Sequence, residues 1–140
     1  MSRITIAVVC ATISLGLAGC FGGRPKDVAA NPGDCYCELS DPQITNFNGS
    51  LRFKVHYCFP DGLPKHEAWF TCTFELQGSN TSAVTVRKAG SALSNEGDLE
   101  GTTNSAFLRR TDGTLSIQMR QADSKTGPYR PVSTPLVTDF

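Results

Sequence analysis

The stretch LRFKVHYCF, residues 51–59, decides the fold class of this chain. Its apolar side chains fall on every second position: Leu51, Phe53, Val55, Tyr57 and Phe59. A period of two is typical of a β-strand with one buried face. Asn48-Gly49 comes directly before this stretch, and both positions of such a dipeptide tolerate the positive φ of a tight hairpin turn. The sequence therefore predicts that residues 43–48 pair with residues 51–59.

Further strands follow toward the C-terminus. Residues 70–76 alternate in the same way, with Phe70, Cys72, Phe74 and Leu76 on one face, and residues 82–88 are rich in β-branched side chains. Residues 98–108 and 114–121 flank the turn sequence Thr111-Asp112-Gly113. This arrangement predicts a hairpin that sets Leu108 opposite Ile117 and Ala106 opposite Met119. Residues 129–138 carry Pro131 and Pro135, so they are expected at a sheet edge or in a loosely paired strand.

These patterns define the fold class. No stretch predicts a helix of convincing length, and about seven short strands with turn signals every 8–12 residues are typical of a β-sandwich or a small barrel. We expect an all-β, small antiparallel β-sandwich. Cys58 and Trp69 have a spacing similar to that of the first cysteine and the tryptophan of an immunoglobulin domain. No cysteine follows Cys72, so an immunoglobulin-like architecture is compatible with the sequence but membership in that family is not supported.

The N-terminal segment predicts export and a lipid anchor. Residues 4–18 are 15 uncharged, mostly apolar positions, which suits the apolar region of a signal peptide, about 7–15 residues, better than a membrane span of about 20. The run ends in Leu17-Ala18-Gly19-Cys20, which resembles the lipobox of bacterial lipoproteins. The resemblance implies that residues 1–19 are a signal peptide removed before Cys20. It also implies that Cys20 carries lipid: a diacylglyceryl thioether on the sulfur and usually a further acyl chain, such as palmitate, on the new N-terminus.

The resemblance also implies a location and a domain order. The lipid on Cys20 would hold the protein at the cell membrane on its extracytoplasmic side. Phe21 stands where an aspartate would resemble an inner-membrane retention signal, so the outer membrane is favoured in a Gram-negative cell. Residues 20–34 are predicted to be the lipidated cysteine and a flexible tether rich in Gly, Pro and Ala, and residues 35–140 the folded domain.

The charge composition argues against nucleic acid as a partner. The chain has 13 basic and 13 acidic residues, and removal of Arg3 with the signal peptide leaves 12 against 13. No basic run stands out, whereas nucleic-acid binding depends on clustered cations.

Four cysteines remain for the domain once Cys10 leaves with the signal peptide and Cys20 is lipidated. They are Cys35, Cys37, Cys58 and Cys72. Export would place them in an oxidising compartment, which favours two disulfides. A Cys35–Cys37 bond would close a very small ring, and Cys58 and Cys72 would point to opposite faces of a regular hairpin. We therefore expect Cys35 and Cys37 each to bond to one of Cys58 and Cys72.

A second interpretation treats the same region as a redox or metal site. Cys35-x-Cys37, His56-x-Cys58, His66 and Cys72 could supply ligands for copper or zinc. The spacing is not that of a zinc finger, and we expect no metal and no other cofactor. Glu96, Asp98 and Glu100 share one face of a strand; calcium binding is one interpretation of this trio and a solvated strand face is the other.

The sequence says less about the function of this protein than about its fold. No nucleophile motif such as G-x-S-x-G is present, and we do not expect an enzyme. Trp69 has the parity of Thr71 and Thr73, opposite the Phe70 and Phe74 face, so it is a candidate ligand contact. The alternative is that it packs under residues 60–65 or against a second sheet. The sequence thus favours a binding or structural module of the cell envelope, with a protein or a glycan as partner.

Overall fold

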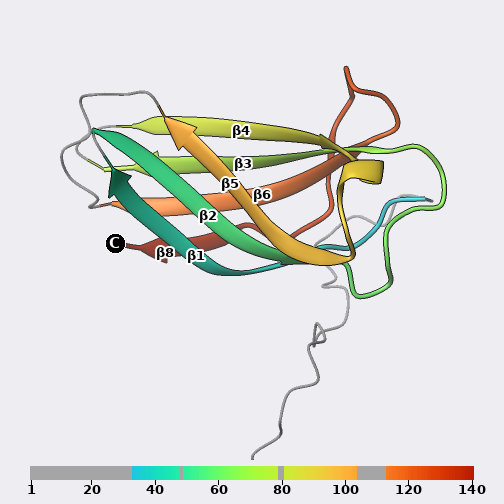
Figure 1. Ribbon diagram of the computed structural model, residues 1–140, viewed down its shortest axis with the longest axis horizontal. Coiled ribbons are helices and arrows are strands. Elements are labelled where there is room, and N and C mark those ends of the chain that lie inside the picture. Colours follow the sequence, from blue (N-terminus) through green and yellow to red (C-terminus); the bar gives the residue numbers. More distant parts are fainter. Residues whose placement is uncertain (1–32, 48, 79–80, 104–112) are drawn as a thin grey trace, which may run out of the picture.

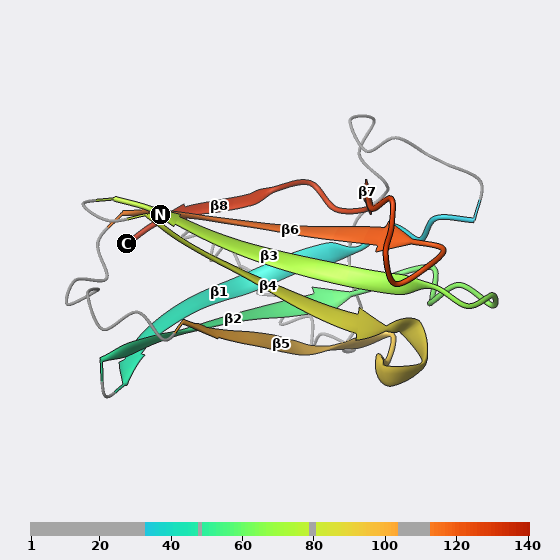
Figure 2. The same cartoon turned by 90° about the horizontal axis from the view of Figure 1, so that it is seen from above.

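The fold consists of two antiparallel β-sheets packed face to face (Figures 1 and 2). A computed structural model describes residues 33–47, 49–78, 81–103 and 113–140 of the chain. Within these residues there is one short 3₁₀ helix, η1 (Gly90–Ala92), and no α-helix, so no helix there could cross a membrane. The strands are β1 (Glu38–Phe47), β2 (Ser50–Cys58), β3 (Trp69–Gln77), β4 (Ser82–Ala89), β5 (Glu96–Thr103), β6 (Thr114–Ala122), β7 (Arg130–Pro131) and β8 (Leu136–Asp139). The prediction of an all-β sandwich is confirmed at this level.

The small sheet has the strand order β1-β2-β5, with β2 in the centre. The predicted hairpin is confirmed: β1 and β2 pair in antiparallel register, with Ile44 opposite Phe53. The turn between them uses Gly49 at φ 79°, a conformation that glycine adopts without steric cost. Leu51, Phe53 and Val55 of β2 are fully buried, so the period of two in this stretch does reflect one inward face.

The large sheet has the order β4-β3-β6, and both β7 and β8 pair with the far side of β6. β3 and β6 form its centre, and their inward side chains are buried: Phe70, Cys72, Phe74, Leu76, Leu115, Ile117 and Met119. β7 and β8, which carry or flank Pro131 and Pro135, lie at the edge. The edge position expected for these prolines is confirmed, because a proline cannot donate to a central ladder.

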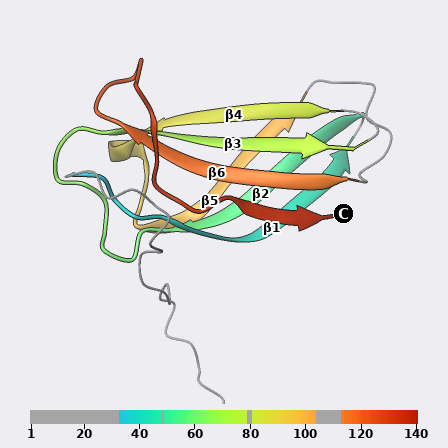
Figure 3. The same ribbon diagram turned by 180° about the vertical axis from the view of Figure 1, so that it is seen from behind.

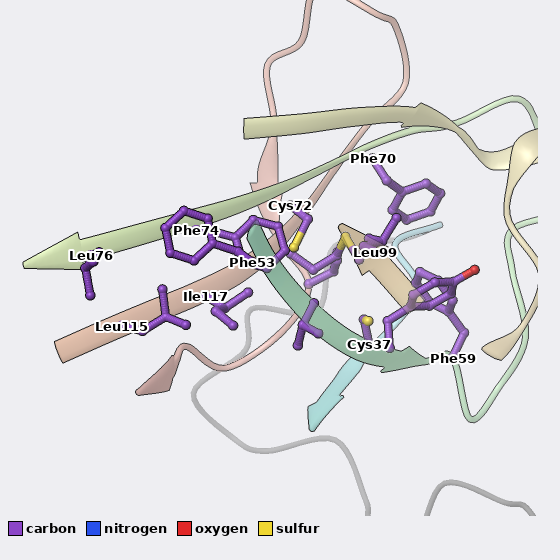
Figure 4. Packing of buried hydrophobic residues seen from close by; sticks show 14 of the residues in the cluster. Cys37, Phe53, Phe59, Phe70, Cys72, Phe74, Leu76, Leu99, Leu115 and Ile117 are labelled. Carbon is purple, nitrogen blue, oxygen red and sulfur yellow. The ribbon is translucent and has the colours of Figure 1, made fainter. Parts of the chain in front are cut away.

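Aromatic rings join the two sheets across the core (Figure 4). Phe53 of β2 stacks on Phe74 of β3 with a centroid distance of 5.7 Å. Phe59, just after β2, meets Phe70 edge to face at 5.2 Å. These contacts make the inward faces of the two sheets one continuous hydrophobic core.

A glycine brings the sheets together along one side. A Cβ added to Gly101 of β5 would lie 2.8 Å from Cγ1 of Val84 on β4, closer than real Cβ contacts come. A larger residue at position 101 would therefore require the Val84 side chain or the edge strands β4 and β5 to shift.

One strand pairing predicted from the sequence is wrong. Residues 98–103 belong to β5, which pairs with β2 in the small sheet, whereas β6 pairs with β3 in the large sheet. The two segments therefore do not form a hairpin, and Ile117 lies opposite Phe74 and Leu136 instead. Ala106 and Leu108 lie outside the described residues. Alternation specifies which face of a strand is buried, but it leaves the partner strand undetermined.

The start of the described chain is held firmly at one end of the sandwich. The side chain of Gln121, fully buried, accepts from the Cys35 N–H at 2.8 Å and donates to the Gly33 carbonyl at 3.1 Å. Arg130 donates twice to the Asp34 carboxylate, at 2.7 and 2.9 Å. The chain therefore enters the domain beside the β2–β3 loop and the β6–β7 loop (Figures 1 and 3).

Candidate functional site

The predicted anchor lies outside the described residues. Cys20 and the predicted signal peptide, residues 1–19, belong to that part, as does the tether up to residue 32. Lipidation of Cys20 and the position of the protein in the envelope remain predictions.

The two predicted disulfides are not supported. Cys37 and Cys72 are free thiols, and each of the two predicted pairings needs both of them to be bonded. Cys58 ends β2 of the small sheet and Cys72 lies within β3 of the large sheet, so the two do not share a hairpin as the sequence suggested.

Two of these cysteines are thiols buried in the core. Burial raises the pKa of Cys72 to about 12 and also raises that of Cys37, so both remain protonated at neutral pH. The Cys37 thiol donates to the Glu38 carbonyl at 3.6 Å. A buried, protonated thiol is a poor nucleophile and a poor metal ligand.

The candidate metal ligands do not converge. Within the described ranges, no group of three or more His, Cys, Asp or Glu side chains could hold a metal ion. His66 lies in the β2–β3 loop, with Nε2 3.8 Å from Asp123. His56 lies in β2 on the outer face of the small sheet, where it bonds to carboxylates.

The outer face of the small sheet carries a network of ion pairs. His56 donates from Nδ1 to Asp98 at 2.9 Å and from Nε2 to Glu96 at 2.8 Å. Hydrogen bonds to Asp98 and then Glu96 raise the pKa of His56 above its ordinary value. Lys54 Nζ lies 3.3 Å from the second oxygen of Asp98. We call Lys54, His56, Glu96 and Asp98 the ion-paired face; its carboxylates are balanced by cations of the same chain.

Trp69 begins β3 on the outer face of the large sheet. Its neighbour Phe70 is buried, whereas Trp69 is half-buried, so the predicted parity is confirmed. Lys125 Nζ, from the β6–β7 loop, lies 5.6 Å from the centre of the indole ring. This cation–π contact comes from residues 123–129, not from residues 60–65, which the sequence offered as a cover for the ring.

A second pair of the same kind lies beside it. Cζ of Arg87, on β4, lies 5.8 Å from the centre of the Tyr129 ring. The Tyr129 hydroxyl donates to the Lys125 carbonyl at 2.7 Å, which fixes the β6–β7 loop. Register places Thr71 between Arg87 and Arg120. Two guanidinium groups and two aromatic rings therefore share one end of this face.

A shallow polar hollow of about 170 Å³ continues the face along the sheet. Arg120 donates from Nε and Nη2 to the Gln118 amide oxygen, at 3.3 and 3.1 Å. Glu75 accepts from the Gln77 amide at 2.8 Å, and the hydroxyls of Thr73 and Thr85 bond at 3.1 Å. The lining is polar throughout: Thr73, Glu75, Ser116, Gln118 and Arg120.

We call Trp69, Tyr129, Arg87, Arg120 and Lys125 the cationic face. None of its three cations forms an ion pair with a carboxylate among the residues that the structure describes. Arg120 bonds to a neutral amide, and the other two lie over aromatic rings. Positive charge on this face is therefore available to a ligand.

Of this set, only Trp69 was predicted from the sequence. Alternation along residues 82–88 could have placed Arg87 opposite the Val84 and Val86 face, and alternation along residues 114–121 could have placed Arg120 opposite Ile117. Nothing in the sequence indicated that β6 pairs with β3 on the side opposite β4, which is what brings the two arginines to the same surface.

Comparison with protein-family models, with curated proteins and with solved structures finds no match for this chain.

Proposed function

We propose that this protein is an exported, lipid-anchored binding module of the cell envelope and not an enzyme. The Leu17-Ala18-Gly19-Cys20 sequence supports an anchor on Cys20, with the domain on the extracytoplasmic side and the outer membrane favoured in a Gram-negative cell. Cys20→Ala is expected to accumulate as an unprocessed precursor that incorporates no labelled palmitate. Undiminished labelling of that variant would rule out the anchor.

The cationic face is the proposed binding surface, and its partner is an envelope protein or a glycan. The observation that carries this proposal is the charge imbalance between the two outer faces. The ion-paired face neutralises its own carboxylates, whereas Arg87, Arg120 and Lys125 lie beside aromatic rings and an amide without a carboxylate among the described residues. Trp, Tyr and Arg are also the residues that contribute most often to binding energy at recognition surfaces.

We further propose that the two sheets have an immunoglobulin-like arrangement of strands. The strand orders β1-β2-β5 and β4-β3-β6-β7 correspond to A-B-E in one sheet and C′-C-F-G in the other. Trp69 lies on the outer face of the third strand, whereas the tryptophan of immunoglobulin domains is buried there. The likeness proposed is therefore one of strand arrangement.

Export of the protein, which is part of the proposed function, would expose the four cysteines of the domain to oxidation. An oxidising compartment favours bonds from Cys35 and Cys37 to Cys58 and Cys72, whereas Cys37 and Cys72 are thiols in the structure. Peptide mapping of the exported protein without reductant tests this part. Unmodified Cys37 and Cys72 peptides would exclude both bonds.

Site-specific photocrosslinking in living cells tests the binding surface. Thr85 on β4 and Thr102 on β5 are both exposed, and they lie on the outer faces of the large and the small sheet. A photoactivatable residue in place of Thr85 is expected to give a discrete adduct, and the same residue in place of Thr102 is expected to give none. An adduct from position 102 alone would show that the wrong face has been chosen.

A further inference from the structure

We propose that the cationic face binds an acidic polysaccharide, a chain of sugars that carry carboxylates. This inference rests on the proposed function, because it names the ligand class of the same face. Three features support it: unpaired cations, a polar hollow and aromatic rings at one end.

The positions of the cations indicate an extended anionic ligand. Arg87 and Arg120 lie opposite Thr71 on the strands to either side of it. Neighbouring strands are about 4.8 Å apart, so the two arginine backbones are separated by roughly 10 Å across the sheet. Lys125 adds a third positive charge at the end of β3, above Trp69. Cations spread in this way match carboxylates that repeat along a polymer better than they match one small anion.

The overall charge of the protein makes this local imbalance informative. The mature chain has 12 basic against 13 acidic residues after removal of Arg3, so it has no general attraction for polyanions. The ion-paired face shows how the fold treats cations elsewhere, since Lys54 and His56 each have a carboxylate within 3.3 Å. Among the described residues, the cationic face thus brings together three cations that form no ion pair with a carboxylate.

The polar hollow favours a sugar over a protein as the ligand. Its lining offers hydroxyl, amide, carboxylate and guanidinium groups, which can donate to and accept from the hydroxyls of a sugar. The centre of a protein–protein interface is instead apolar and depleted of charge. Glu75 lies toward the opposite end of β3 from Trp69, and its carboxylate can accept hydrogen bonds from sugar hydroxyls.

The aromatic rings complete the site. Trp69 and Tyr129 are half-buried, and each has a cation beside its ring. A sugar ring has an apolar C–H face that can pack on an aromatic ring, while its carboxylate reaches the adjacent ammonium or guanidinium group. Each aromatic–cation pair thus supplies both contacts that an acidic sugar needs.

The single tryptophan of the chain makes the test direct, because Trp69 reports from within the site. The mature lipidated protein in a non-ionic detergent is titrated with polygalacturonate while its fluorescence is recorded. Fully methyl-esterified polygalacturonate, which has the same backbone without charge, is the first control, and poly-L-glutamate of equal charge is the second. We expect a saturable change with polygalacturonate, at least tenfold weaker binding of poly-L-glutamate, and no response to the ester. Binding is also expected to weaken as salt is raised.

Matched variants locate the site. Arg87→Gln with Arg120→Gln is expected to weaken polygalacturonate binding at least tenfold, since charge-assisted hydrogen bonds are the strong ones. Arg52→Gln removes an exposed cation from the outer face of the small sheet. This variant is expected to change the affinity for polygalacturonate less than twofold. Circular dichroism verifies that each variant keeps its β-sheet.

Each adverse result identifies what fails. Equal binding of poly-L-glutamate would overturn the sugar assignment in favour of an acidic polypeptide, and equal binding of the ester would overturn the requirement for acid groups. If Arg52→Gln weakened polygalacturonate binding as much as the double arginine variant does, the assignment of the binding site to the cationic face would be wrong. If position 85 gives its adduct in cells but no polysaccharide binds, the ligand class is wrong and the binding surface of the proposed function stands.

Discussion

The two outer faces of this sandwich are built on the same plan but use charge in opposite ways. On the small sheet, His56 lies between Glu96 and Asp98, and Lys54 shares Asp98. On the large sheet, Arg87 and Lys125 lie over rings. Both faces are exposed strand surfaces with long polar side chains, so composition alone does not separate them.

The difference shows that the pairing of charges, more than their number, distinguishes a stabilising surface from a binding one. A cation with a carboxylate partner contributes modestly to stability and is neutralised toward ligands. A cation over an aromatic ring is held in position and keeps its charge. The ion-paired face is accordingly assigned to stability and the cationic face to recognition.

The largest loss of stability is expected from a substitution in the hydrophobic core, not from one on either outer face. Phe74→Ala removes a fully buried ring that stacks on Phe53, and we expect it to lower the free energy of unfolding by about 3–5 kcal/mol. Thr73→Ala, one position away on the outer face, is the control and should cost less than about 1 kcal/mol. Urea denaturation measures both. Similar losses would mean that the outer face of the large sheet is structural.

Removing charges should affect the two faces unequally. Glu96→Gln with Asp98→Asn leaves Lys54 and His56 without carboxylate partners, and we expect a loss of about 0.5–1 kcal/mol in the free energy of unfolding. Arg87→Gln with Arg120→Gln breaks no ion pair among the described residues and should change it by less than about 0.5 kcal/mol. Urea denaturation at low salt gives the comparison. A larger loss from the arginine pair would reverse the assignment of the two faces.

The smallest effect is a pH dependence that belongs to the ion-paired face. The pKa of His56 is raised in the folded state by hydrogen bonds to Asp98 and Glu96. Its stabilisation is therefore fully present below the unfolded value of 6.5 and is lost as pH rises through the higher folded pKa. Because the side chains are partly exposed, the change should be less than about 1 kcal/mol. Stability curves above pH 6.5 should be flatter for His56→Gln than for the wild type.

The same network predicts the opposite sign at low pH. The hydrogen bond from His56 lowers the pKa of Asp98, so this contribution is present above the ordinary value of 3.8 and is lost as pH falls through the lower folded pKa. His66→Gln leaves His56 and its carboxylates in place and serves as the control. A His56→Gln profile that coincides with the wild type in both pH ranges would show that the network contributes nothing.

Parts of the site could be predicted and parts could not. The parity of Trp69 followed from alternation with Phe70, and Glu96 and Asp98 do share a strand face, as the sequence predicted. The partner of those carboxylates was missed, since His56 lies far from them along the chain. The aromatic–cation pairs were also missed. Lys125 and Tyr129 lie far along the chain from Trp69 and Arg87, and they reach the sheet from a loop.

The sequence by itself determined the strands and their buried faces. Alternation acts residue by residue, so Leu51, Phe53 and Val55 specify an inward face whatever the partner strand is. The Asn48-Gly49 turn likewise specified the β1–β2 hairpin, because the chemistry of a two-residue turn is local.

Only the tertiary structure decided which strands became neighbours. Residues 98–103 joined β2 and not β6, since the core forms where Phe53 and Phe74 stack and where Gly101 lets β5 approach β4. That choice also set the surfaces, placing β4 and β6 on either side of β3. Arg87 and Arg120 share a face because packing energy between sheets, which no local pattern encodes, selects the strand order.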